Sequence, residues 1–311
     1  MSCLTRKEML SKKIGVLLGG LSAEREISLK TGNASLRALQ QLGYAAVAID
    51  VQQNLPQQLQ EAGIEIAFIA LHGRFGEDGR VQGLLEMLQI PYTGSGVMAS
   101  SMAIDKVMTK QLLIYHELPT PRFDFMRPGD SASDLFQRCN HLPLVVKPSR
   151  EGSTIGITIA RNRVDLDAGI AMAAALDGTV LVEEFIAGAE LTVSVLNGET
   201  LPIIQIVPKG GFYDYQAKYV SGDTEYLLPA PIDADSYQQV QQAALKTCRV
   251  LGCRGAARVD FMFREGKYFC IEINTIPGMT ETSLLPKAAQ AAGIDFPQLV
   301  EMMLLDADLD K

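Results

Sequence analysis

The sequence predicts an α/β protein whose C-terminal part has α+β character. In the first hundred residues, short apolar runs such as 13–18 alternate with helix-length segments, which is typical of a parallel sheet with right-handed crossovers. Near the C-terminus, segments 258–263 and 268–274 are rich in β-branched and aromatic residues. Residues 264–267 between them contain a glycine and charged residues, which is typical of a turn, so we expect an antiparallel hairpin there.

Length and composition exclude several classes of protein. The chain of 311 residues is long enough for two or three domains, and its 47% hydrophobic and 21% charged residues are typical of a globular protein. A net charge of -8 without any basic run argues against nucleic acid as a partner. No apolar run approaches a membrane span, and residues 1–8 lack the apolar core of a signal peptide, so we expect a cytoplasmic protein. Five scattered cysteines favour free thiols, and three histidines show no zinc spacing.

Polar segments follow two strands of the predicted parallel sheet. Two glycines and Glu24 follow the strand at 13–18, and His72 follows the strand at 66–71. Ligands gather at the carboxyl ends of parallel strands, so these residues could belong to a small-molecule pocket. Glu24 could instead complement the dipole of the helix expected over 23–42, and His72 could be a core histidine. The full GxGxxG pattern is absent, which argues against a Rossmann dehydrogenase.

The middle of the chain offers candidate phosphate contacts. We expect one helix over 97–116, in which Lys106 could be a solvated helix lysine. Lys147 closes an apolar strand at 142–148, which is unusual because lysine is rarely buried unpaired. The next loop, which contains Ser153, is small and bears hydroxyl groups. Such a loop lets backbone N–H groups approach a phosphate closely, although a flexible hairpin is the alternative.

A second group of strands leads to a long irregular segment. Strands expected over 180–186 and 190–196 carry acids near their ends, which could bind amines or hydroxyls or could face water. Segment 208–231 shows no regular pattern but contains several tyrosines, which is typical of a lid or binding loop. Within it, Lys218 is suitably placed for a phosphate and Tyr219 for a substrate contact.

The predicted hairpin carries the most informative polar residues. Arg258 and Asp260 share one face of the first strand, and Glu272 and Asn274 share one face of the second, because side chains alternate along a strand. Antiparallel pairing could therefore bring an Asp, a Glu and an Asn together. Hard oxygen donors suit a magnesium ion that holds phosphate, although a solvated edge hairpin is the alternative. A turn containing Gly278 follows, and its exposed N–H groups would suit an anion.

Several motifs together resemble those of the D-alanine–D-alanine ligase family, which has the ATP-grasp fold. They are Gly19-Gly-Leu-Ser-Ala-Glu-Arg-Glu, His72-Gly, Lys147-Pro-Ser-Arg-Glu-Gly-Ser, Tyr213-Asp-Tyr-Gln-Ala-Lys-Tyr, Arg258-Val-Asp and Glu272-Ile-Asn-Thr-Ile-Pro-Gly-Met-Thr. They span residues 13–305 in the family's order and spacing, and only Ile276 departs, where the family often has serine. The resemblance implies a three-domain ATP-grasp protein with an N-terminal doubly wound parallel sheet. Its domains would cover residues 1–104, 105–187 and 188–311.

The resemblance also implies how ATP and metal are bound. ATP would lie between the central and C-terminal domains as a co-substrate. The residues expected around its phosphates, adenine and ribose are Lys106, Lys147, Ser153, Glu183, Phe185, Ile186, Glu190, Lys218, Phe261 and Asn274. Asp260, Glu272 and Asn274 would bind two magnesium ions, with manganese as an alternative, and Glu272 would bridge them.

The implied reaction joins two D-alanines through an acyl phosphate and releases ADP and phosphate, for peptidoglycan precursor synthesis. Glu24 would pair with the ammonium of the first D-alanine, close to His72. Arg258 and the backbone N–H of Gly278 would stabilise the oxyanion. The carboxylate of the second D-alanine would be bound by Ser283 and Leu284, and a Glu24–Ser153–Tyr219 group would cross the site. The family also implies a homodimer.

Two alternatives stay open at this point. One is a related ATP-grasp carboxylate–amine ligase, or an ester-forming D-alanine–D-lactate ligase. Tyr219 favours the dipeptide, because ester-forming members typically have phenylalanine at the matching position. The other alternative is a catalytically silent nucleotide-binding regulator. A pure binder has no need of an oxyanion donor such as Arg258, which argues against this second alternative.

Overall fold

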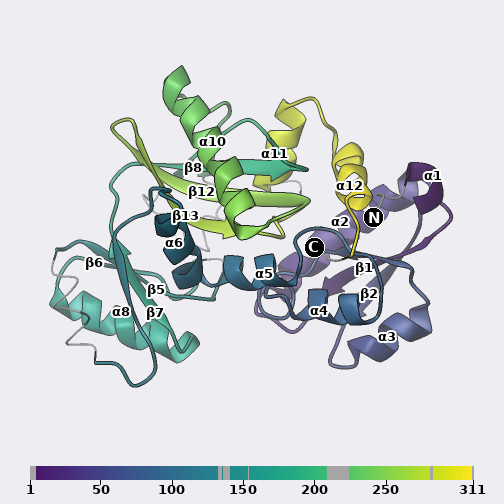
Figure 1. The fold of residues 1–311 in the computed structure, drawn as a ribbon, viewed down its shortest axis with the longest axis horizontal. Helices are drawn as coiled ribbons and strands as arrows, with labels where there is room; N and C mark the ends of the chain where they lie inside the picture. Colours follow the sequence, from purple (N-terminus) through teal and green to yellow (C-terminus); the bar gives the residue numbers. More distant parts are fainter. Residues whose placement is uncertain are drawn as a thin grey trace.

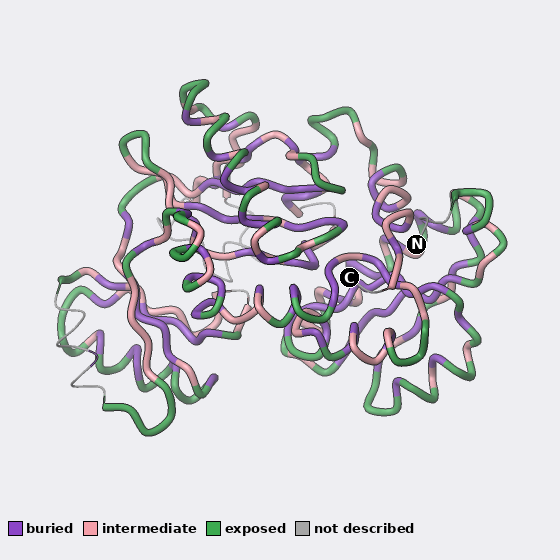
Figure 2. Tube along the Cα trace, in the orientation of Figure 1, coloured by how far each residue is buried: buried purple, intermediate pink, exposed green. Residues whose placement is uncertain are grey.

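The computed structural model describes residues 5–131, 135, 141–152, 154–208, 224–280 and 283–309. A parallel sheet and two antiparallel sheets, each covered by helices, form three neighbouring parts (Figure 1). This arrangement confirms the α/β class with α+β character in the C-terminal part. Figure 2 shows that the central strands are buried whereas the outer faces of the helices are exposed. Within the described residues, no helix combines the length and apolar character that crossing a membrane requires.

The N-terminal sheet is parallel, with the order β2-β1-β3. Its elements are β1 (Lys13–Gly19), β2 (Ala45–Val51), β3 (Ile66–Ile69), α1 (Arg6–Met9), α2 (Arg25–Gln41), α3 (Leu55–Ala62), α4 (Arg80–Met87) and α5 (Val97–Ile104). Successive residues of β1 enter different hydrophobic cores, one on each face of the sheet. Val16 belongs to the cluster of Leu39 on α2, whereas Leu17 belongs to the cluster of Leu59 on α3. Helices therefore cover both faces, which confirms the doubly wound sheet.

The single helix predicted over 97–116 is wrong, because the structure contains two helices there. α5 ends at Ile104 and α6 (Lys106–Tyr115) follows, with Asp105 between them in an extended conformation. The Asp105 carboxylate accepts hydrogen bonds from the backbone N–H groups of Val107 and Met108, each over 3.1 Å. Asp105 is therefore the N-cap of α6, and its capping preference outweighs the continuous helical pattern.

The central sheet is antiparallel, with the order β4-β7-β5-β6. It consists of β4 (Phe123–Met126), β5 (Leu144–Pro148), β6 (Thr158–Ala160) and β7 (Val180–Glu184), and α8 (Arg163–Leu176) packs on it. Leu166, Ile170 and Ala173 lie on one side of α8 and enter the core shared with the sheet. Side chains of β5 and β7 that do not point toward α8 point to the opposite face of the sheet.

The C-terminal sheet has the order β11-β10-β8-β12-β13, and β9 pairs with β8. Its elements are β8 (Ala189–Leu196), β9 (Glu199–Thr200), β10 (Ile204–Pro208), β11 (Thr224–Leu227), β12 (Ala256–Arg264), β13 (Lys267–Asn274), α10 (Ala234–Leu251), α11 (Leu284–Ala291) and α12 (Phe296–Leu305). The predicted hairpin is confirmed as β12 and β13. Leu285 and Leu304 share a core cluster with Val16, so the last two helices pack against the N-terminal part (Figure 1). The predicted boundaries near residues 104 and 187 stay predictions.

Candidate active site

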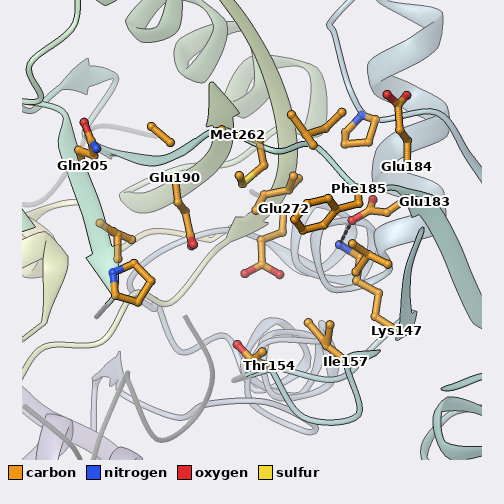
Figure 3. A pocket seen from close by; sticks show the side chains of 18 of the residues that line it. Lys147, Thr154, Ile157, Glu183, Glu184, Phe185, Glu190, Gln205, Met262 and Glu272 are labelled. Carbon is orange, nitrogen blue, oxygen red and sulfur yellow. Dashed lines mark ion pairs between the residues drawn. The ribbon is translucent and has the colours of Figure 1, made fainter. Parts of the chain in front are cut away.

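A cavity of about 310 Å³ lies between the central and C-terminal sheets. This volume lies within the range of small-molecule pockets. Six of the predicted ATP and metal contacts line it, namely Lys147, Glu183, Phe185, Ile186, Glu190 and Glu272. Figure 3 shows the Glu190 and Glu272 carboxylates on one side of the cavity, directed toward Thr154 and Ile157. The cavity therefore brings together cationic and anionic groups from two separate sheets.

The β12–β13 hairpin holds the predicted polar set. In the pairing of β12 with β13, Arg258 lies opposite Asn274 and Asp260 lies opposite Glu272. The alternation of side chains along the two strands predicts this arrangement. Arg258 donates two hydrogen bonds to the Asp260 carboxylate, over 2.9 and 2.7 Å. Asn274 donates to the same carboxylate over 3.2 Å, and the hydroxyl of Thr192 donates over 2.6 Å. The buried Asp260 is thus fixed by donors from three strands.

The donor chemistry of this set fits magnesium. Asp260 and Glu272 supply carboxylate oxygens from opposite register positions, and Asn274 supplies an amide oxygen. The described residues contain no group of three or more His, Cys, Asp or Glu side chains able to hold a metal ion. This site would therefore depend on two carboxylates together with an amide.

A smaller recess continues from the cavity toward the N-terminal sheet. Its lining includes Lys106, Gly152, Asn274 and Glu272, and Glu272 also lines the main cavity. The Lys106 ammonium donates to the backbone carbonyl of Glu151 over 2.8 Å and lies 3.6 Å from the Glu272 carboxylate. Lys106 therefore connects the glycine-containing loop to the predicted metal-binding strand.

Glu24 and His72 lie next to residues that line this recess, Glu24 beside Gly152 and His72 beside Glu77. A Cβ atom added at Gly152 would lie 2.9 Å from Glu24 Oε2, so the loop backbone approaches this carboxylate closely. His72 is buried, and its Nε2 lies 3.1 Å from Thr31 Oγ1. Thr31 also accepts a hydrogen bond from the backbone N–H of Met279 over 3.4 Å. Thr31, which the sequence analysis missed, thus links His72 to the turn that contains the predicted oxyanion donor.

Burial lowers the pKa of His72, but a hydrogen bond to Glu77 and the charges of Glu77 and Glu24 raise it overall above 6.5. The imidazolium then stabilises the fold below the unfolded pKa of about 6.5, and this contribution disappears as the pH rises through the folded pKa. Glu77→Gln should therefore lower the free energy of unfolding more at about pH 6 than at about pH 9. Urea denaturation at both pH values measures this, with the exposed Glu199→Gln as control. An equal loss at both pH values would contradict the assignment.

The turn after the hairpin brings Gly278 and Ser283 together. A Cβ atom at Gly278 would lie 2.9 Å from Ser283 Oγ. Ser283 precedes α11 as its N-cap, and Leu284 is the first helical residue. The Leu284 side chain is buried in the core, so only its backbone N–H can meet an anion there. Because helix N-termini favour negative charge, this placement suits a carboxylate.

Some predicted site residues do not reach the cavity or cannot be placed. Phe261 is fully buried in the core of the C-terminal sheet, and the cavity lining contains Met262 instead. This corrects the expectation that the Phe261 side chain packs near adenine, since neighbouring residues of a strand face opposite sides. Ser153, Lys218 and Tyr219 lie outside the described residues.

A cavity between two antiparallel sheets, with Lys147 on the central sheet and Glu190 and Glu272 on the C-terminal sheet, is the arrangement expected of a nucleotide-dependent ligase of the ATP-grasp class. The families described as "D-ala D-ala ligase C-terminus" and "D-ala D-ala ligase N-terminus" match residues 112–305 and 51–95. The chain therefore belongs to the D-alanine–D-alanine ligase family.

Known proteins similar to this chain agree with that membership. The D-alanine–D-alanine ligase of Syntrophotalea carbinolica is 58% identical, covering 99% of this chain and 100% of that protein. The ligase of Pelotomaculum thermopropionicum is 47% identical, covering 95% and 96%. A crystal structure of the ligase from Bacillus anthracis has a TM-score of 0.86 and 36% identity, covering 95% and 97%. The same ligase complexed with ATP has a TM-score of 0.83 and 34% identity, with the same coverage.

Proposed function

We propose that this protein joins two D-alanines into D-alanyl-D-alanine at the expense of ATP, releasing ADP and phosphate, for peptidoglycan precursor synthesis. One observation carries this proposal. Glu272 lines both the cavity beside Lys147 and the recess beside Gly152, the glycine that Glu24 approaches, so a nucleotide and an amino acid can meet at Glu272. The similar ligase solved with ATP supports the identity of the nucleotide.

The first half of the reaction turns a carboxylate into an acyl phosphate. A carboxylate is a poor acylating agent because oxide would have to leave, whereas phosphate leaves easily. Lys106 and Lys147 would bind the ATP phosphates, and Asp260, Glu272 and Asn274 would hold two magnesium ions, or manganese. Bound there, the metal would neutralise charge on the phosphoryl group during transfer. The Glu24 carboxylate would orient the ammonium of the first D-alanine.

In the second half, the amine of the second D-alanine attacks the acyl carbonyl and phosphate leaves. Arg258 and the backbone N–H of Gly278 would stabilise the oxyanion. Ser283 and the backbone N–H of Leu284, at the start of α11, would bind the carboxylate of the attacking molecule. Ser153, Lys218 and Tyr219 are the remaining residues that we propose for the site. A site closed over its substrates would exclude water, which otherwise hydrolyses an acyl phosphate.

The direct test is a screen of amino-acid substrates with coupled detection of ADP. We expect ADP release that requires ATP, magnesium and D-alanine together. Turnover only with another amino acid would overturn the substrate assignment. Competition between D-alanine and D-lactate at neutral pH distinguishes dipeptide from ester formation. Because ATP is a cytoplasmic nucleotide, we expect the reaction in the cytoplasm, and a homodimer is expected from the family.

Gly152→Ala tests the proposed role of Glu24. The added methyl group would meet Glu24 Oε2 at 2.9 Å, so the carboxylate has to shift. We expect the KM for D-alanine to rise about tenfold, equivalent to about 1.4 kcal/mol, while the KM for ATP changes less. Gly83→Ala is a matched control, because the nearest atom to its added Cβ lies 3.9 Å away. An unchanged KM for D-alanine in Gly152→Ala would contradict the role of Glu24.

A further inference from the structure

Lys110 is a fully buried lysine that neither the sequence motifs nor the proposed chemistry uses. It lies on α6 one turn after Lys106, so the two ammonium groups project from the same side of the helix. The Lys110 ammonium lies 2.7 Å from Glu183 Oε2 and donates a hydrogen bond to Thr120 Oγ1 over 2.5 Å. Burying a charged group without a partner is costly, so this position requires those contacts.

Glu183 lies between two ammonium groups. Its second carboxylate oxygen, Oε1, lies 2.6 Å from the ammonium of Lys147 (Figure 3). Burial raises the pKa of Glu183, but the two lysines lower it overall, so the carboxylate is ionised. Burial and the charge of Lys147 lower the pKa of Lys110 overall, although the charge of Glu183 opposes them. With both lysines protonated, two ammonium groups and one carboxylate give this triad one net positive charge.

Only one lysine of the triad faces the cavity. Lys147 and Glu183 line it, whereas Lys110 lies behind Glu183 and does not. Lys110 is also connected to β13, because the Thr120 hydroxyl donates to the backbone carbonyl of Cys270 over 2.8 Å. Cys270 precedes Glu272 by two residues on that strand. Lys110 therefore contacts groups attached to both sheets that enclose the cavity.

We propose that Lys110 is a positioning residue for ATP, acting through Glu183 on Lys147. Lys110 forms an ion pair with one oxygen of the Glu183 carboxylate, and Lys147 forms an ion pair with the other oxygen. The triad therefore presents a positive charge to the triphosphate. Without Lys110, Glu183 and Lys147 form a neutral pair at the cavity wall. The inference rests on the proposed function only in taking ATP as the ligand of this cavity.

The test uses Lys110→Met and Lys110→Gln in the full chain. We expect the Kd for ATP, measured by calorimetry, and the KM for ATP to rise about tenfold, with the KM for D-alanine within about twofold. Lys110→Gln retains hydrogen-bonding capacity without charge, so it remains informative if Lys110→Met does not fold. Lys246→Met is the matched control, because its exposed ammonium bonds only the backbone carbonyl of His116 among the described residues.

A double variant distinguishes an effect of the Lys110 charge on ATP binding from a loss of structural support. Lys110→Met combined with Glu183→Gln leaves Lys147 as the single charge, so the net charge returns to that of the wild type. We expect its Kd for ATP to be lower than that of Lys110→Met, although it stays above that of the wild type because Glu183 is itself a predicted ATP contact. A double variant that binds ATP more weakly than Lys110→Met would overturn the proposal, as would single variants with an unchanged Kd.

Calorimetry keeps this test independent of the proposed ligase reaction. A wild-type protein that binds ATP but does not release ADP with D-alanine would refute the proposed function alone. The comparison of Kd values among the Lys110 variants would still decide the role of this residue. If the wild type releases ADP with D-alanine while the variants bind ATP normally, only the inference about Lys110 fails.

Discussion

Glu272→Gln is expected to retain ATP binding while ADP release with D-alanine falls about a thousandfold, equivalent to about 4 kcal/mol of lost transition-state stabilisation. The amide keeps the size of the side chain but removes the negative charge that strengthens the hold of a carboxylate on a divalent cation. Glu272 lies opposite Asp260 in register and 3.6 Å from Lys106, at the junction of cavity and recess. The remaining cavity lining is unaltered, so the nucleotide should still bind.

Two measurements check this expectation. ADP release is followed in a coupled assay, and metal affinity is measured by titrating the protein with manganese in the presence of ADP. We expect metal affinity to fall at least tenfold in Glu272→Gln. Glu265→Gln provides the matched control, because this exposed glutamate lies in the turn of the same hairpin. A wild-type rate of ADP release in Glu272→Gln would contradict the assignment of Glu272 as a metal ligand.

Arg258→Lys is expected to lower the rate of dipeptide formation about a hundredfold, with the Kd for ATP nearly unchanged. Lysine retains the positive charge but cannot reproduce the two-pronged contact that Arg258 makes with Asp260. Asp260 keeps its hydrogen bonds from Thr192 and Asn274, so the predicted metal ligands stay in place. The loss should therefore appear in kcat, where oxyanion stabilisation acts.

The control for this prediction lies on the same strand. Arg264→Lys makes the same chemical change at a guanidinium that lies 6.0 Å from the Phe269 ring, near the hairpin turn. We expect kcat for Arg264→Lys within about twofold of the wild type. If Arg258→Lys and Arg264→Lys behave alike, Arg258 does not act on the oxyanion.

Local sequence rules predicted much of the candidate site because strand periodicity is a local property. The two-residue spacing of Arg258 and Asp260, and of Glu272 and Asn274, fixed which side chains share a face. The same alternation could have excluded the Phe261 side chain from the cavity, since it lies next to Asp260 and faces the core. The β-bulge between these two residues alters the register but leaves Phe261 buried.

The helical pattern alone was less reliable. Residues 97–116 contain a continuous run of helix-compatible residues, yet Asp105 divides it because its carboxylate caps α6. The Ser149 hydroxyl donates to the same carboxylate over 2.9 Å. This contact joins segments more than forty residues apart in the chain, so no local pattern could show it.

By itself, the sequence indicated the parallel N-terminal sheet, the antiparallel hairpin and the faces that carry its polar residues, because these follow from the order of the segments and from the alternation of side chains along a strand. Only the tertiary structure decided that Glu183 lies between Lys110 and Lys147, and that Thr31 joins His72 to Met279. These contacts depend on how α6, β5, β7 and the N-terminal sheet pack. Burial makes each of these polar groups require a partner, and packing selects which one it finds.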